Sequence, residues 1–502
     1  MIFPRRLSSS HHGVGTYRQL AAGITASISV MCLGIAMGWS SPILQKFATE
    51  RPSPILPAPT EDQLSWMIAF MEFGNLFTPV ITGILVDVIG RQKTLVLIGP
   101  LFALSWLIIY LSQTIYFLYV ARVIQGLGCG VVYTAVPIYL GEISDPKVRG
   151  ALSNLFQGFM YIGLLYAYVL GPFYSYSNFT LFCMAIPLVF SISVLFVPET
   201  PYFLLMQNKD TLARKVLREL RDSTDDINEE MRAMKESVEK EMEGAKNPDK
   251  NRKITNIKLF LISQFFGSCQ IMTNMYAILS YSSMVFDKGG SHWLTPDQYT
   301  IFLGVITLVS TVPSSFLVDK LGRKPLLVTS AITCGVLELL AGVYFLLRER
   351  NAIQGDDYGW CVFVFVSGLS FCYSFGLGPI IPTIQCELFP TNARGLAFGL
   401  TILITSVTAF LNILQFQWFA SSPKLGMSAN FFFGCVMCLL VAEFTVAVMP
   451  ETKGRTFAEI QLLFHKDEGV ERVSVLEAGE GDGPDSRLNP ERGKDEGAGV
   501  GS

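Results

Sequence analysis

The sequence predicts an all-α membrane protein with twelve transmembrane helices in two pseudo-symmetric bundles of six. Half of the 502 residues are apolar and only 16% are charged, and the mean hydropathy is +0.42. Apolar stretches recur along the chain, each long enough to cross a hydrocarbon core of about 30 Å. We find no ten-residue alternating pattern of the kind that barrel strands show, so helices are expected to satisfy the backbone polar groups within the bilayer.

Internal duplication is the second observation behind this fold class. The segment DVIGR at 87–91 returns as DKLGR at 319–323, and PET at 198–200 returns at 450–452. Between these pairs, EISDPKVR at 142–149 returns as ELFPTNAR at 387–394. The copies keep their order and nearly the same separation, which indicates two parallel halves of similar length.

The apolar stretches give the positions of the individual helices, six in each half. We expect spans at 21–43, 63–86, 94–112, 117–141, 151–172, 179–197, 256–286, 298–318, 326–347, 359–385, 396–418 and 429–449. When both chain ends are placed in the cytoplasm, most of the 38 Lys and Arg residues fall on the cytoplasmic side, as the positive-inside rule requires. Asn178-Phe-Thr180 is a formal glycosylation acceptor, but it abuts the sixth span and we expect it to remain unmodified.

The spans divide the chain into five parts: a cytoplasmic N-terminus at 1–20, a bundle at 21–197, a linker at 198–255, a second bundle at 256–449 and a cytoplasmic tail at 450–502. The linker is rich in charges, with Leu212, Val216 and Leu220 on one helical face, which indicates short amphipathic helices. These helices either take part in gating or form a solvated connection. After about residue 467 the tail has few large apolar residues, so we expect disorder there.

Cysteine and histidine patterns exclude several classes of protein. The ten cysteines lie almost wholly within predicted spans and form no disulfide framework, and all four histidines lie outside the spans. We find no combination of nucleophile, histidine and acid in a plausible context and no phosphate-binding loop. The sequence therefore predicts neither an enzyme nor a protein that binds a metal, a cofactor or nucleic acid.

Charged residues recur at the cytoplasmic ends of the spans in both halves. Gly90 permits a tight turn beside Asp87 and Arg91. Each pair alone is consistent with a topology signal or a structural clasp, but duplication of all of them favours a shared gate that holds the halves together on the cytoplasmic side. The candidate gating residues are Asp87, Arg91, Glu142 and Arg149, with Asp319, Arg323, Glu387 and Arg394 in the second half.

These motifs, together with RVIQGLGCGVVYTAVPIYLGEI, PETPYFLL, GLGPIIPTIQCELFP and PETKGRTFAEI, resemble the sugar porter family of the major facilitator superfamily, and within it the insect trehalose transporter-like group. The resemblance runs from about residue 20 to 465. It implies the major facilitator fold and alternating access about a central site. It also implies facilitative transport of a sugar or sugar-like solute of the trehalose or hexose class. We expect a multi-pass monomer in the cell membrane, with the solute and the lipid bilayer as partners.

The resemblance also places a solute site, and most of that site is altered. Gln157 and Gln270 stand where the family has sugar-contacting glutamines. Other family positions, which carry Gln, Asn or Trp in relatives, are here Ile271, Tyr276, Thr307, Thr383 and Thr405. Fewer amides mean fewer hydrogen bonds to sugar hydroxyls. A carrier for a non-sugar or more apolar solute, or a sensor that does not transport, therefore remains an alternative.

Acidic residues within the spans bear on energy coupling. Proton-coupled sugar porters carry an acid in the first helix, and TASISVMCLGIAMGWSS has none, which favours a facilitator. Glu72, Glu338 and Glu443 lie within other spans, where an unpaired carboxylate costs several kcal/mol. For each of them we expect structural pairing or a neutral acid.

Overall fold

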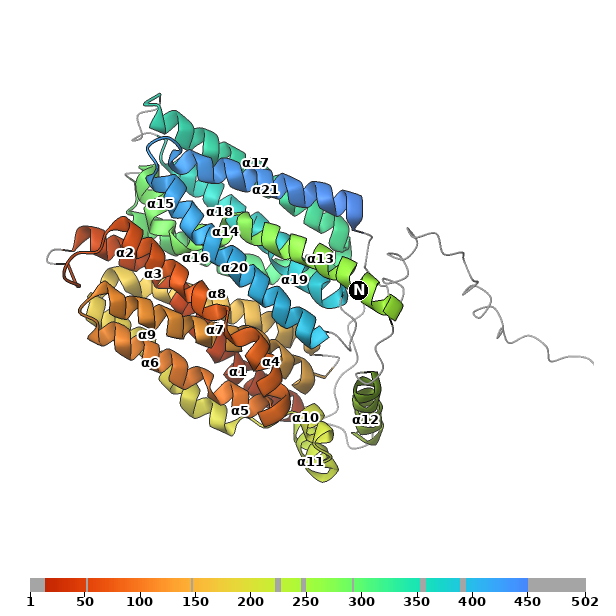
Figure 1. Cartoon of the computed structure of the whole chain (residues 1–502). Helices are drawn as coiled ribbons and strands as arrows, with labels where there is room; N and C mark the ends of the chain where they lie inside the picture. The colour runs from red at the N-terminus through yellow and green to blue at the C-terminus, as the bar shows by residue number, and fades with distance from the viewer. Residues whose placement is uncertain are drawn as a thin grey trace, which may run out of the picture.

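A computed structural model describes residues 14–50, 53–145, 148–221, 227–244, 250–290, 293–352, 358–388 and 394–449. The described residues confirm the all-α prediction, since they form two groups of long helices that lie side by side (Figure 1). Ten helical segments of this part of the chain are long and apolar enough to cross a membrane. The other two predicted spans, 256–286 and 298–318, coincide with α13–α15 and with α16.

The N-terminal bundle contains more helices than spans because several spans are broken by a turn. Its first breaks follow Gly38, Asn75 and Val96. The capping box of Thr60 and Gln63 starts α3 by satisfying backbone N–H groups of its first turn. The elements are α1 (Val14–Gly38), α2 (Ser40–Thr49), α3 (Glu61–Asn75), α4 (Thr78–Ile89), α5 (Arg91–Val96), α6 (Ile98–Leu111), α7 (Ile115–Ile143), α8 (Arg149–Phe173), α9 (Tyr176–Ser193) and the 3₁₀ turn Val194–Phe196.

The C-terminal bundle repeats this pattern, and α16 begins with the same kind of capping box, formed by Thr295 and Gln298. A left-handed residue, Asn274 with φ 61°, separates α13 from α14. The elements are α13 (Lys250–Met272), α14 (Met275–Ser280), α15 (Ser282–Gly289), α16 (Pro296–Leu321), α17 (Arg323–Glu349), α18 (Trp360–Phe375), α19 (Leu377–Leu388), α20 (Arg394–Ser421) and α21 (Gly426–Val448).

The duplicated glycine turns have nearly the same backbone conformation. Gly90, between α4 and α5, has φ 105° and ψ 163°, and Gly322, between α16 and α17, has φ 90° and ψ 161°. These positive φ values strain any residue with a Cβ atom. Gly90 therefore makes the tight turn that the sequence predicts, and the duplication extends to the backbone.

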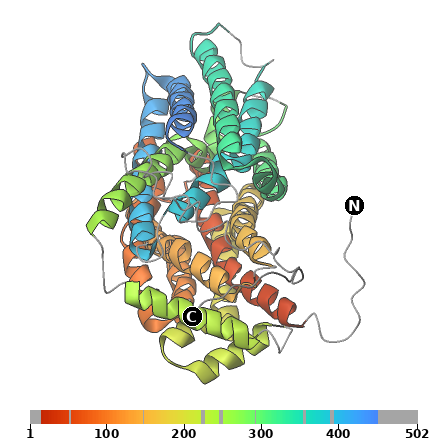
Figure 2. The same cartoon turned by 90° about the vertical axis from the view of Figure 1, so that its right-hand side faces the viewer.

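The linker forms α10 (Pro201–Met206), α11 (Asp210–Leu220) and α12 (Ile227–Gly244), the yellow-green helices at the lower end of Figure 2. The predicted apolar face was partly wrong: Leu220 is buried as expected, but Leu212 is half exposed, and α11 buries Ala213 and Leu217. Ala213 and Leu217 pack in a cluster of their own with residues of α10 and α12.

Polar contacts fasten this linker to the N-terminal bundle. The guanidinium of Arg221 donates to Ile143 O at 3.1 Å and pairs with Glu230 at 2.7 Å, which ties the end of α7 to α12. A hydrogen bond from Lys235 to Asp210, at 2.8 Å, ties α12 to α11 and raises the pKa of the lysine amine. The predicted tail, 450–502, lies outside the described residues.

Candidate functional site

A cavity of about 550 Å³ lies between the two bundles. From the N-terminal bundle, α1, α3, α7 and α8 contribute to its wall, and from the C-terminal bundle α13, α14, α18, α19 and α20. Its size is in the range of sites that hold a small molecule. Helices of both halves therefore meet around one space.

The cavity brings together most of the solute-site residues that the sequence predicts. Gln157 on α8 and Gln270 on α13 face it from opposite bundles. Ile271, Tyr276 and Thr405 line it as well. The side chain of Thr383 lies outside the described part of the structure.

The two glutamines are held differently. The amide of Gln270 donates to Tyr373 Oη at 3.2 Å, to Leu377 O at 2.8 Å and to Gly378 O at 3.2 Å. These bonds tie α13 to the junction of α18 and α19. Gln157 hydrogen-bonds Tyr161, which lies one turn later on its own helix. Gln270 is thus also a structural residue of the C-terminal bundle, whereas the bond of Gln157 is local.

Thr307 does not line this cavity, contrary to its expected place in the solute site. Its side chain is fully buried between α16 and α18. The hydroxyl donates to Leu303 O at 2.7 Å and lies 2.6 Å from Ser370 Oγ. Because its polar group is satisfied within the bundle, Thr307 has no geometric support as a solute contact.

The wall contains polar and aromatic groups that the sequence analysis did not select. Asn75 and Gln385 each add an amide, and the rings of Tyr133, Tyr161 and Tyr373 add aromatic surface. Asn75 follows Glu72 by three residues, which places both on one face of α3, and that spacing was the available signal. The cavity is therefore richer in amides than the substitutions at family positions suggested.

Glu72 also lines the cavity, and it is paired. Tyr276 Oη donates to its Oε1, and Asn75 Nδ2 donates to its Oε2 at 3.3 Å. Glu338 differs, since both of its carboxyl oxygens are buried without a hydrogen-bond partner among the described residues. Glu72 thus has the hydrogen-bond partners that structural pairing requires, and a neutral acid would accept the same two bonds.

The bundles are joined at the end of the molecule where α2 and α15 lie, at the left of Figure 1. Ser41 Oγ on α2 lies 2.9 Å from Ser282 Oγ and 2.7 Å from Ser283 Oγ. Tyr281 Oη donates to Ser65 Oγ of α3 at 3.3 Å. These side chains are buried, so this end of the cavity is closed.

A second cavity, of about 500 Å³, adjoins the first and lies between α8, α16 and α18. Gln157, Tyr161 and Gly378 line both cavities. Its wall includes Asn154, near the start of α8, and Val312, in the later half of α16. Val309 and Val312 of this wall are 59% and 64% exposed, so the second cavity is a groove that opens at the outer surface of the helices. The first cavity is the one that reaches toward the end that carries α10–α12, where Leu140 of α7 and Thr401 of α20 line it.

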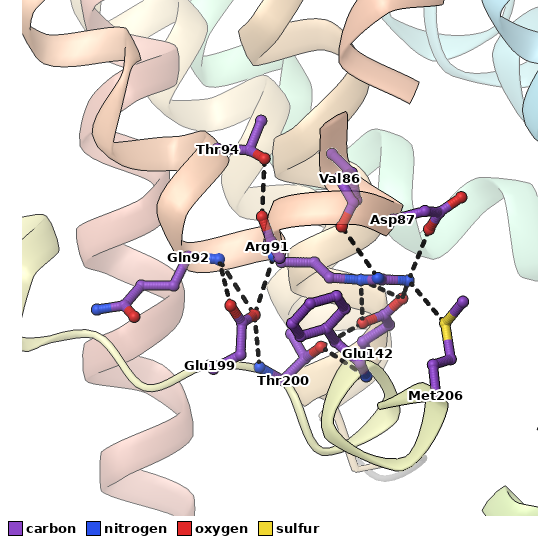
Figure 3. Close-up of polar contacts among 11 residues, drawn as sticks. Val86, Asp87, Arg91, Gln92, Thr94, Glu142, Glu199, Thr200 and Met206 are labelled. Carbon is purple, nitrogen blue, oxygen red and sulfur yellow. Dashed lines mark hydrogen bonds and ion pairs between the residues drawn. The ribbon is translucent and has the colours of Figure 1, made fainter. Parts of the chain in front are cut away.

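At that end, Arg91 is the centre of a clasp formed by Asp87, Arg91, Glu142, Glu199 and Thr200 (Figure 3). Its guanidinium pairs with Glu142 at 2.8 Å and with Asp87 at 3.3 Å. Glu199 accepts the backbone N–H groups of Arg91 and Gln92, at 3.0 Å and 3.1 Å. Thr200 Oγ1 donates to Glu142 at 2.5 Å.

Every residue drawn in the clasp belongs to the N-terminal half of the chain. The structure therefore brings together three of the predicted gating residues, Asp87, Arg91 and Glu142. Arg323 takes the matching place in the C-terminal half, just after the Gly322 turn. The side chains of Arg149, Asp319, Glu387 and Arg394 lie outside the described part, so the shared gate stays a prediction.

Comparison with known proteins decides the family. Residues 19–464 match the family model described as sugar (and other) transporter. The chain belongs to the sugar transporter family. It is 30% identical over 451 residues to the facilitated trehalose transporter Tret1 of Bombyx mori, which covers 89% of this chain and 86% of that protein. It is 29% identical over 456 residues to Tret1 of Apis mellifera ligustica.

Solved structures establish the fold of this sugar transporter family member. The proton:xylose symporter XylE, of the major facilitator superfamily, superposes with a TM-score of 0.73 over 89% of this chain and 99% of that chain, at 20% identity. An inward open structure of XylE from E. coli gives a TM-score of 0.72. The chain therefore has the twelve-helix major facilitator fold, as the sequence predicted, and it is a membrane transporter rather than an enzyme.

Proposed function

We propose that the protein is a facilitative transporter of a sugar of the trehalose or hexose class. The observation that carries this proposal is the cavity between the bundles, to which one bundle contributes Gln157 and the other Gln270. Amides supply both donors and acceptors to sugar hydroxyls, and the tyrosine rings offer apolar surface to the C–H face of a sugar. The relatives named as trehalose transporters support the same solute class.

Transport proceeds by alternating access, with both chain ends in the cytoplasm. In this orientation the end with α2 and α15 is the external face, and it is closed by the serine contacts of Ser41. The cavity between the bundles continues from Gln157 toward the cytoplasmic end, where Leu140 and Thr401 line it. The conformation is thus closed outside, and rocking of the bundles would expose the two glutamines to either side in turn.

In this proposal, transport of the solute is not coupled to the movement of protons. The residues of α1 include no Asp or Glu, so the first helix has no group that could bind a proton together with the solute. The carrier acts as a monomer in the cell membrane, since one chain contains both bundles and the whole cavity.

Uptake into liposomes that contain the purified protein tests this function. The panel consists of radiolabelled trehalose, glucose, a polyol such as mannitol, and an apolar glycoside. We expect saturable flux of trehalose or glucose that the unlabelled sugar inhibits. Flux of only the apolar glycoside would contradict the sugar class, and no flux of any solute would favour the sensor.

A further inference from the structure

Glu72 is the one acidic or basic side chain among the described residues that line the cavity. It belongs to α3, and it is only 5% exposed. A charge at this depth is costly unless it has partners. We therefore looked for the groups that stabilise Glu72 in the cavity wall and for a function of its carboxylate.

The partners of Glu72 come from both bundles. Tyr276, on α14, donates to one carboxylate oxygen from the C-terminal bundle. Asn75 donates to the other oxygen, and the same amide donates to Ser406 of α20 at 2.8 Å. A carboxylate offers about four acceptor positions, so two hydrogen bonds leave it able to accept more from the cavity side.

Buried charge in the same bundle balances this carboxylate. Arg122, on α7, is fully buried and acts electrostatically on Glu72. Its hydrogen-bond acceptors are neutral: Ala36 O at 2.7 Å, Ser40 Oγ and Gln125 Oε1 at 2.8 Å each, and Met67 O at 3.3 Å. Arg122 does not line the cavity, so its charge favours the Glu72 carboxylate from within the bundle and leaves the cavity side of that carboxylate to a solute.

We propose that Glu72 determines specificity by accepting a hydrogen bond from a solute hydroxyl, in competition with the phenol of Tyr276. This inference rests on the proposed transport function and deepens it. Tyr276 moves with the C-terminal bundle when the outer end opens, and the freed carboxylate then accepts the solute hydroxyl. Because hydrogen bonds to a charged acceptor are stronger than those between neutral groups, a polyhydroxy solute is selected over a more apolar one.

Three variants separate solute recognition from a purely structural link between the bundles. Glu72→Gln keeps the shape and removes the charge. Tyr276→Phe removes only the phenol oxygen that occupies Glu72. The matched control is Tyr281→Phe, which also removes a hydroxyl bonded across the bundles, to Ser65, but from a residue that does not line the cavity.

The measurement is the initial rate of trehalose and glucose uptake into liposomes, resolved into KM and kcat. For Glu72→Gln we expect KM to rise about tenfold, the loss of one charge-assisted hydrogen bond. For Tyr276→Phe we expect KM to fall, because the competing donor is gone. Tyr281→Phe measures the effect of weakening the outer closure alone, so its KM should shift less than that of Tyr276→Phe.

An unchanged KM in Glu72→Gln, or equal shifts in Tyr276→Phe and Tyr281→Phe, would overturn the proposal. If Glu72→Gln fails to fold, the change of KM in Tyr276→Phe decides: a lower KM supports the proposal, and a higher KM overturns it. Wild-type protein without sugar flux would contradict the proposed function instead. In that case, stabilisation of the purified variants by glucose in thermal melts gives the same comparison of affinity without transport.

Discussion

Arg91 holds Glu142 with two parallel hydrogen bonds, from Nε at 2.9 Å and from Nη2 at 2.8 Å. The exposed fractions of these side chains are 4% for Arg91 and 15% for Glu142, whereas Asp87, the second carboxylate beside Arg91, is 59% exposed. Water can therefore solvate Asp87 if the guanidinium is removed, whereas it reaches Glu142 much less.

This difference predicts unequal effects of substitution on stability. Arg91→Ala should lower the free energy of unfolding by up to about 3–5 kcal/mol, because it leaves the mostly buried Glu142 carboxylate without a cationic partner and with only the Thr200 hydroxyl as a donor. Asp87→Asn, the control, should cost at most about 1 kcal/mol, since an exposed ion pair contributes little. Thermal unfolding of the purified variants in detergent measures both. Similar losses in the two variants would contradict the clasp.

The shared gate can be tested by charge reversal at the duplicated arginines. We expect Arg149→Glu and Arg394→Glu to bias the population toward the inward-facing state, because each weakens closure on the cytoplasmic side. Transport should fall while delivery to the cell surface stays normal, as measured by surface biotinylation alongside uptake. Wild-type transport rates in both variants would refute the gate.

The sequence was sufficient for the fold because its signals are local and repeated. Apolar length gave the spans, and Gly90 with Gly322 gave the turns that the structure shows. The face of α11 was misjudged at Leu212, because apolar residues four positions apart do not show which side of a short helix meets α10 and α12.

The site was only partly predictable. Gln157, Gln270 and Tyr276 followed from the resemblance, and the structure places them around one cavity. Thr307 followed from the same resemblance but lies outside the cavity, where its hydroxyl contacts Leu303 O and Ser370 Oγ. The Tyr276 bond to Glu72 joins residues 204 positions apart, which no local pattern reports.

Backbone strain at the duplicated turns gives a third test. Gly90→Ala should destabilise the protein by at least about 1–2 kcal/mol, because φ is positive there and an added Cβ would lie 2.3 Å from Glu199 Oε2. Gly83→Ala is the control, since it lies within α4 with open space around its Cβ position. It should be neutral or stabilising, by roughly 0.5–1 kcal/mol. Equal destabilisation of both variants in thermal melts would contradict the assigned turn.

Both cavity glutamines should contribute to solute binding, but only Gln270 should also contribute to thermal stability. Replacing either Gln157 or Gln270 by Ala should weaken solute binding by about 1–3 kcal/mol. Gln270→Ala should also lower thermal stability, because it loses the bonds to Leu377 and Gly378. KM from uptake and melting temperature from the same preparations test both points, and unchanged KM in both variants would place the solute elsewhere.

Restoring family residues at two of the predicted solute positions tests whether their replacement limits sugar affinity. Thr383→Trp combined with Ile271→Gln adds an indole and an amide and leaves the Tyr276 bond to Glu72 intact. If the missing groups limit sugar affinity, KM for glucose should fall in the double variant. A higher KM would indicate that Asn75 and Gln385 already complete the site.

Facilitative sugar transport is tested most directly by the plateau of uptake. Liposomes containing the protein are loaded with buffer, given an inward proton gradient and exposed to radiolabelled trehalose or glucose. We expect internal sugar to rise until it equals the external concentration, with the same plateau after a protonophore is added. Accumulation above the external concentration that collapses with the protonophore would contradict it, and Glu72→Gln would then be the first variant to examine.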